Sequence, residues 1–101
     1  MSERCQCPIE RALQVIGAKW VPLIVRDLLE GPKRFNELQS SLGSVSPRTL
    51  SERLKDLEEQ GVISRHAYPE VPPRVEYRLT PKGMALHDLL EDMRRWGERW
   101  A

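Results

Sequence analysis

The sequence predicts an α+β domain that is mostly helical and carries one β-hairpin. Three observations support this prediction. Between residues 35 and 60, apolar residues recur at the three- and four-residue steps of amphipathic helices, and a glycine-containing turn interrupts them. From residue 62 to residue 79, the period changes to the two-residue alternation of strands. Further helical stripes precede and follow this block. Two short helices joined by a turn and followed by a β-hairpin form a winged helix-turn-helix.

The composition limits the classes of protein to which the chain can belong. Its 101 residues fit a single domain over 1–101, and 40% hydrophobic residues allow a modest core of the kind that small domains often complete by dimerising. The net charge of +1 gives no support to a generally basic surface, so DNA binding would need locally placed cations. No apolar run approaches the roughly 20 residues of a membrane span, and the start MSERCQCPIER lacks a signal-peptide core. We therefore expect a cytoplasmic protein with no membrane partner.

Two helices are expected before the central block. In the first, Cys7 stands at the N-cap and Pro8 at the first helical position, where proline is favoured. Its apolar stripe is Ile9, Leu13 and Ile16. A second helix is predicted from Lys19 to Glu30. Apolar residues nearly surround it, which predicts a buried helix at the centre of the domain. These residues are Val21, Leu23, Ile24, Val25, Leu28 and Leu29.

The central block, about residues 35–60, predicts a helix-turn-helix with its turn at 43–45. Ser46 can cap the second helix with its hydroxyl, Pro47 fits the first position, and Gly61 supplies the left-handed residue that ends the helix. The apolar face of this helix is formed by Leu50, Leu54 and Leu57. Such a second helix can lie in a DNA major groove. The alternative is an ordinary helical hairpin in a small bundle.

A β-hairpin is predicted at about residues 62–79, with a proline-rich loop at 69–73. In its second strand, Val75, Tyr77 and Leu79 alternate with Arg74, Glu76 and Arg78. One face is therefore expected to pack on the helices, whereas the other carries two arginines. A wing directly after a helix-turn-helix favours DNA binding over a helical bundle.

A final helix is predicted from Thr80-Pro81 to the end of the chain. Its wide apolar stripe ends in two tryptophans, and large apolar surface that the monomer cannot cover indicates a partner. We expect a homodimer interface built from this helix and the helix at 7–16. The alternative is that these side chains fold back onto the domain's own core. The expected interface residues are Ile9, Leu13, Leu86, Leu89, Leu90, Met93, Trp96 and Trp100.

Several stretches resemble, in order and spacing, the HxlR-type winged-helix transcriptional regulators. They are Cys7-Pro8, IGAKW at 16–20, RFNEL at 34–38, SPRTL at 46–50 and PPRVEYRLTPKG at 72–83. Ala18 stands where the family more often has glycine. The resemblance implies a homodimeric bacterial DNA-binding regulator that acts as a repressor or activator. It also implies that some members sense oxidants or electrophiles through the cysteine matching Cys7.

Candidate DNA contacts lie on the second helix of the helix-turn-helix. Arg48, in its first turn, is the best candidate for reading a base edge, because arginine pairs bidentately with guanine. A phosphate contact is the alternative for Arg48. Thr49 and Ser51 are candidate polar contacts, and Lys55 is expected to contact phosphate. Arg53 lies at the edge of the apolar stripe, where pairing with a nearby acid is the alternative.

The wing supplies the other candidates. Arg74 and Arg78 are expected to reach the DNA backbone or the minor groove. The alternative is a cross-strand ion pair with Glu76 or Glu70. The full set of expected DNA contacts is Ser46, Arg48, Thr49, Ser51, Arg53, Lys55, Arg74 and Arg78.

Two cysteines, Cys5 and Cys7, are the candidate redox residues. Cys7 falls at a predicted helix N-terminus, whose dipole favours the thiolate. Oxidised Cys7 could form a strained disulfide with Cys5 or a disulfide with a cysteine of a second subunit. Alternatively, an electrophile could add to the Cys7 thiolate. An inert, half-buried cap is the alternative. The two cysteines are too few for a structural zinc site, so neither a metal nor a cofactor is expected.

The sequence thus predicts a sequence-specific, homodimeric regulator that binds a double-stranded DNA operator, with a small oxidant or electrophile as effector. An enzyme is the competing class, but Cys7 has only His66 or His87 as a base, and neither lies in a catalytic motif. The chain also lacks a glycine-rich phosphate loop. A winged helix used only for protein contacts is the third reading, and its basic residues on the second helix and wing argue against it.

Overall fold

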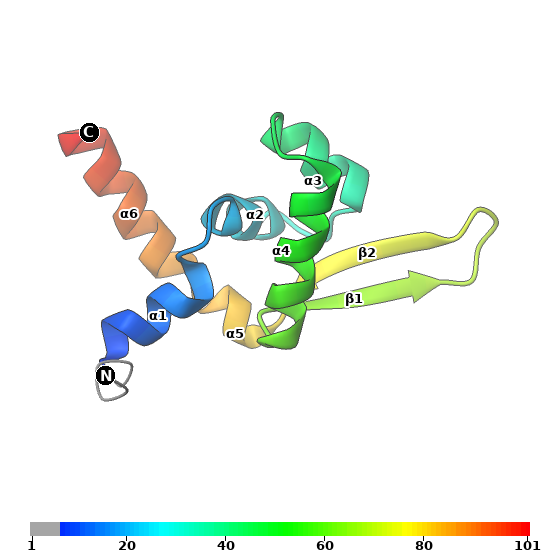
Figure 1. Ribbon diagram of the computed structural model, residues 1–101, viewed down its shortest axis with the longest axis horizontal. Helices are drawn as coiled ribbons and strands as arrows, with labels where there is room; N and C mark the ends of the chain where they lie inside the picture. The colour runs from blue at the N-terminus through cyan, green and yellow to red at the C-terminus, as the bar shows by residue number, and fades with distance from the viewer. Residues whose placement is uncertain (1–6) are drawn as a thin grey trace.

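Three helices, α2, α3 and α4, form the centre of the computed structural model, and a two-stranded wing leaves them on one side (Figure 1). The structure describes residues 7–101. At the end opposite the wing, α1 and α6 diverge from one another. The elements are α1 (Pro8–Ile16), α2 (Val21–Leu28), α3 (Phe35–Leu42), α4 (Pro47–Glu59), β1 (Ile63–Tyr68), β2 (Arg74–Leu79), α5 (Pro81–Met84) and α6 (His87–Trp100). None of the described helices is long and apolar enough to cross a membrane.

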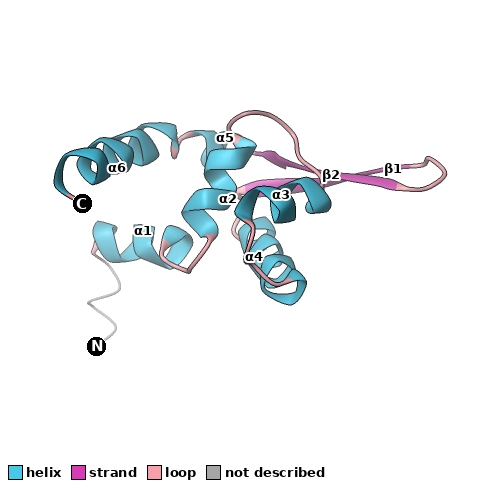
Figure 2. Ribbon diagram, turned by 90° about the horizontal axis from the view of Figure 1, so that it is seen from above, coloured by secondary structure: helices cyan, strands magenta, loops and turns pink. Residues whose placement is uncertain are grey.

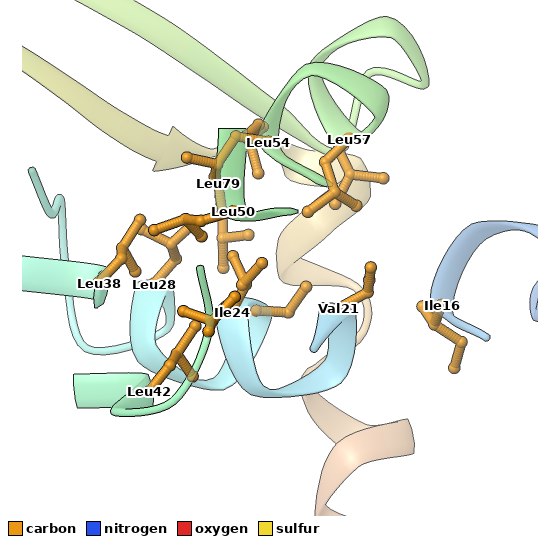
Figure 3. Packing of buried hydrophobic residues seen from close by; sticks show 14 residues of the cluster. Ile16, Val21, Ile24, Leu28, Leu38, Leu42, Leu50, Leu54, Leu57 and Leu79 are labelled. Atoms are coloured by element: carbon orange, nitrogen blue, oxygen red, sulfur yellow. The ribbon is translucent and has the colours of Figure 1, made fainter. Parts of the chain in front are cut away.

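Helix α2 lies at the centre of the hydrophobic core, as its apolar sequence predicted (Figure 3). Ile24 and Val25 are completely buried, and leucines of α3 and α4 pack around them. Leu23 is the exception, because it is exposed beside α6. The predicted start at Lys19 is wrong by two residues. Trp20 has a φ of 82°, outside the helical region, so the helix begins only at Val21.

The helix-turn-helix forms where the sequence predicted it. Gly43 has a φ of 78°, which turns the chain after α3, and Val45 is buried in the turn. The Ser46 hydroxyl accepts a hydrogen bond from the Thr49 backbone N–H at 3.1 Å and so caps α4. Gly61, with a φ of 76°, reverses the chain after α4. Leu50, Leu54 and Leu57 form the apolar face of α4, and all three are buried.

The wing is an antiparallel hairpin whose register sets two faces. Ile63 pairs with Leu79, and both are buried against the helices. Because side chains alternate along a strand and cross-strand partners share a face, the register assigns every residue to one side. The inner face, toward the helices, holds Ile63, Arg65, Ala67, Val75, Tyr77 and Leu79. The outer face holds Ser64, His66, Tyr68, Arg74, Glu76 and Arg78.

The wing is attached to the helical body at its base. Lys33, in the loop between α2 and α3, exchanges two backbone hydrogen bonds with Tyr77, of 3.1 and 2.8 Å. At the same, base end of the wing, directly after β2, the Thr80 hydroxyl donates to the Val62 carbonyl at 3.1 Å and accepts from the Gly83 N–H at 3.2 Å. These bonds fix the direction of the wing relative to α4.

The prediction of one continuous C-terminal helix is wrong. Helix α5 ends at Met84, and α6 begins only at His87. The Leu86 N–H bonds to the Gly83 carbonyl, three residues back, so the chain tightens and turns between the two helices. The break follows from packing, because Thr80 and Gly83 hold α5 against the wing base while Leu86 packs against the core.

Replacing Gly83 by alanine is expected to destabilise the fold. The added methyl carbon would lie 2.3 Å from the Val62 carbonyl oxygen and 2.8 Å from Leu79 Cδ2. Overpacking of this kind costs about 1–3 kcal/mol, which urea unfolding followed by circular dichroism measures. Gly97→Ala is the matched control, because there the same methyl group meets no atom of residues 7–101 within 4 Å apart from its own helical turns. An equal loss of stability in both variants would contradict the packing argument.

Candidate nucleic-acid interface

The first turn of α4 is held rigid by its own cap. Besides accepting from the Thr49 N–H, the Ser46 hydroxyl donates to Thr49 Oγ1 at 3.0 Å. The two hydroxyls therefore bond to each other and to the backbone, in a cap that sets the start of the helix. Both residues were predicted to contact DNA, and the structure gives them this additional, structural bonding.

The exposed face of α4 carries the other predicted contacts. Arg48 is almost fully exposed, with 89% of its side chain accessible, and its Nε lies 3.4 Å from Glu52 Oε2. Exposed ion pairs of this kind contribute little, so the arginine can leave Glu52 for another acceptor. Ser51 and Lys55 are also exposed, and within the described part of the chain Lys55 makes no ion pair. The burial of the opposite, leucine-lined face is what turns this side outward.

Arg53 is oriented differently from its predicted role. Its Nε donates a 3.0 Å hydrogen bond to the Lys19 carbonyl, in the turn between α1 and α2. The sequence analysis gave pairing of Arg53 with a nearby acid as the alternative; the observed partner is a backbone carbonyl instead. The bond joins α4 to the segment in which Trp20 has a left-handed backbone. No local sequence signal predicted it, because the two residues are 34 positions apart.

The outer face of the wing contains a connected cluster around Tyr68. The Arg74 guanidinium lies 4.3 Å from the centre of the Tyr68 ring, and its Nη2 is 3.1 Å from Glu70 Oε2. Arg78 Nη2 donates to the Tyr68 hydroxyl at 2.6 Å and lies 3.7 Å from Glu76 Oε1. Glu76 Oε2 is also 3.9 Å from Arg74 Nε. The ion pairs considered as the alternative for these two arginines are therefore present for both.

Arg65 is a wing residue that the sequence analysis did not select. It is exposed on the inner face, and no ion pair joins it to any residue of 7–101. The sequence did contain a signal for its position: Arg65 is two residues after the apolar Ile63, and residues two apart on a strand share a face. Arg65 could therefore have been placed on the face of the wing that packs on the helices.

The expected dimer residues divide into two groups. Leu86 and Leu90 pack against the monomer's own core, which was the alternative considered for the whole stripe. The others are exposed, with accessible fractions of 71% for Ile9, 64% for Trp96 and 66% for Trp100. The apolar patch, as we call the exposed group, consists of Ile9, Leu13, Leu89, Met93, Trp96 and Trp100.

A groove runs through the apolar patch between α1 and α6. Ile9 and Leu13 line it on the α1 side, and Leu89 and Met93 line it on the α6 side, with Pro22 between them. Figure 1 shows the two helices spreading apart from this groove. An open apolar groove on diverging helices is accessible to another chain.

Cys7 occupies the N-cap position of α1, as predicted, but its side chain makes no capping hydrogen bond. Its thiol is free and exposed, so the half-buried alternative is wrong. Cys5 lies outside the described residues. Among residues 7–101, no three His, Cys, Asp or Glu side chains are grouped so that they could hold a metal ion.

Comparison with known proteins supports the resemblance noted in the sequence. Residues 15–101 match the family described as HxlR-like helix-turn-helix. The chain is 45% identical over 101 residues to YvaP of Bacillus subtilis (strain 168), an uncharacterized HTH-type transcriptional regulator, covering 99% of this chain and 94% of that protein. The redox regulator HypR in its oxidized form is 40% identical, with a TM-score of 0.89 over 94% of this chain and 98% of that one. The reduced form of the transcriptional regulator YodB from B. subtilis is 37% identical, with a TM-score of 0.83 over 95% of each chain.

Proposed function

This chain belongs to the HxlR-like helix-turn-helix family, and we propose that it regulates transcription as a homodimer whose α4 helices read an operator in double-stranded DNA. The relatives found are transcriptional regulators, not enzymes. The observation that carries the proposal is the division of α4 into a buried leucine face and an exposed face bearing Arg48, Ser51 and Lys55. Selection of binding sites from a random duplex library, followed by gel shift, tests it.

Each residue of the α4 surface has a distinct proposed part. Arg48 stands in the first turn, where recognition helices meet base edges, and it is free to exchange Glu52 for guanine. Lys55, further along the helix, contacts phosphate. Ser51 supplies a hydroxyl between them. Arg53 acts from behind the interface, because its bond to Lys19 holds α4 in place.

The apolar patch supports a homodimer. Exposed tryptophans and leucines on two neighbouring helices are unfavourable in water, and a second copy of the chain offers the same surface. A two-fold contact buries this surface on both subunits at once, which is the commonest arrangement of dimers. It also places two α4 helices on one molecule, as a palindromic operator requires, with half-sites about one helical turn of roughly 34–36 Å apart or a multiple of it.

Cys7 supports a redox-responsive form of this regulator. Its exposed thiol lies at the start of α1, beside the groove of the apolar patch. In a dimer formed there, two thiols from different subunits can lose two electrons and two protons to an oxidant such as diamide, forming one S–S bond. The bond constrains how the subunits rotate, and therefore how far apart the α4 helices lie. HypR, described as a redox regulator, has the same fold.

The first prediction concerns base reading. Arg48→Ala is expected to cost about 1–3 kcal/mol of binding free energy on the selected operator and to relax the preference at one position of each half-site. Lys55→Ala serves as the comparison, because loss of a phosphate contact weakens all sequences alike. Fluorescence anisotropy on operator and random duplexes measures both. Equal losses for Arg48→Ala on the two duplexes would make Arg48 a phosphate contact.

The second prediction concerns assembly. Met93→Glu is expected to give a monomer that binds operator poorly, because it places a carboxylate in the apolar patch without touching the core. Leu90 is unsuitable for this test, since it packs inward. Arg95→Glu puts the same group on the polar side of α6 and should leave the dimer intact. Multi-angle light scattering reports the mass, and a wild type that is monomeric at micromolar concentration contradicts the proposal.

The third prediction concerns the thiol. Diamide is expected to produce a disulfide-linked dimer on non-reducing gels and to change operator affinity in the wild type. Cys7→Ser should abolish both effects, whereas Cys5→Ser should at most weaken them. The measurement is a titration of operator binding against diamide for the three proteins. Unchanged wild-type affinity, with Cys7 still free by thiol labelling, would show that Cys7 has no regulatory part.

A further inference from the structure

We propose that Arg65 is the wing residue that contacts the DNA backbone, and that Arg74 and Arg78 act instead to shape the wing. The inference rests on the proposed function, because it assigns a contact within the same interface. It reverses the assignment that the sequence favoured, in which the two arginines of β2 reached the DNA. The argument depends on the face, the pairing and the local charge of each arginine.

The strand register places Arg65 on the same side of the wing as α4. Arg65 pairs with Tyr77 and is two residues from buried Ile63, so its side chain projects from the inner face. Figure 2 shows the wing nearly edge-on, with α4 on one side of it. A duplex that contacts the exposed surface of α4 therefore approaches the wing from the side of Arg65. The side chains of Arg74 and Arg78 project from the opposite face of the wing.

The positive charge of Arg65 is not compensated locally. The neighbouring residues of the inner face beyond the core are Ala67, Val75 and Tyr77, and none of them carries a carboxylate. On the edge of β2 away from β1, the backbone of Lys33 pairs with Tyr77. The nearby carboxylate there, Glu30, is already paired with Lys33, at 3.2 Å between Oε1 and Nζ. Arg65 itself is exposed and makes no ion pair within residues 7–101. An exposed, uncompensated guanidinium is suited to a phosphodiester oxygen, which it can approach through several N–H donors.

The outer face is already electrostatically neutral. Its two arginines are balanced by Glu70 and Glu76, at 3.1 Å from Arg74 and 3.7 Å from Arg78. The Tyr68 ring and hydroxyl hold both guanidinium groups in addition. An arginine of this cluster that turned to phosphate would give up its contact with Tyr68 as well as its glutamate, whereas Arg48 gives up the exposed pair with Glu52. The cluster therefore joins the ends of the two strands across the wing and contributes little attraction for DNA.

The test compares Arg65→Gln with Arg78→Gln as the matched control, since each removes one charge from one face of the same hairpin. Affinity is measured by fluorescence anisotropy on a random-sequence duplex and on the selected operator, at several salt concentrations. Each phosphate contact contributes about 0.9 to the slope of log K against log salt. Arg65→Gln should lower this slope by about that amount on both duplexes and weaken both severalfold, whereas Arg78→Gln should leave the slope unchanged.

One further variant and one further measurement distinguish loss of a phosphate contact from damage to the fold. Arg65→Lys retains the charge and should restore most of the wild-type slope, which loss of a merely structural side chain would not predict. Thermal unfolding of each variant verifies that the wing is folded. A slope reduced by Arg78→Gln alone, or equally by both variants, overturns the assignment to Arg65, as does an unchanged slope in Arg65→Gln. If the wild type binds no duplex even at low salt, the DNA-binding function itself fails, which is a different result.

Discussion

The burial of α2 is the constraint on which the rest of the structure depends. Ile24 and Val25 are inaccessible to solvent, so this helix must be covered on several sides at once. Helices α3 and α4 and the base of the wing supply the cover, and Leu50, Leu54 and Leu57 are the part that α4 contributes (Figure 3). The same leucines that complete the core therefore determine which side of α4 faces outward. The exposed face of α4 is therefore a consequence of how α2 is buried.

The surroundings of this core connect the wing and α4 with α1 at the opposite end of the molecule. The wing is fixed by the Lys33–Tyr77 bonds on one edge and by Thr80 at its base. On the other side, the Arg53–Lys19 bond joins α4 to the turn that follows α1. Cys7 directly precedes helix α1, which carries part of the apolar patch. A change in how two α1 helices meet thus has a short path, through hydrogen-bonded backbone, to the helix that is proposed to read DNA.

Charge placement matters more here than charge total. With a net charge of +1, the chain has little general attraction for nucleic acid, so the position of each cation decides what it can do. On the outer face of the wing, cations and anions neutralise one another around Tyr68. On α4 and on the inner face of the wing, Lys55 and Arg65 lack ion pairs in the described part of the chain. A nearly neutral protein can in this way present a cationic surface on one side.

Local sequence determined the elements, because caps, periods and left-handed glycines act within a few residues. The cap at Ser46, the stop at Gly61 and the change to a two-residue period after it were all readable, and they fixed the helix-turn-helix, the wing and the outward face of α4.

Only the tertiary structure decided the rest. Whether Leu90 packs inward while Met93 stays exposed depends on where α6 leaves α5, and that break is set by the fit of Gly83 against Val62. Which arginine is paired depends on the register of β1 against β2 and on contacts such as Arg53 to Lys19, which join residues far apart in the chain. Periodicity places a residue on a face, but the partner it meets there belongs to another element.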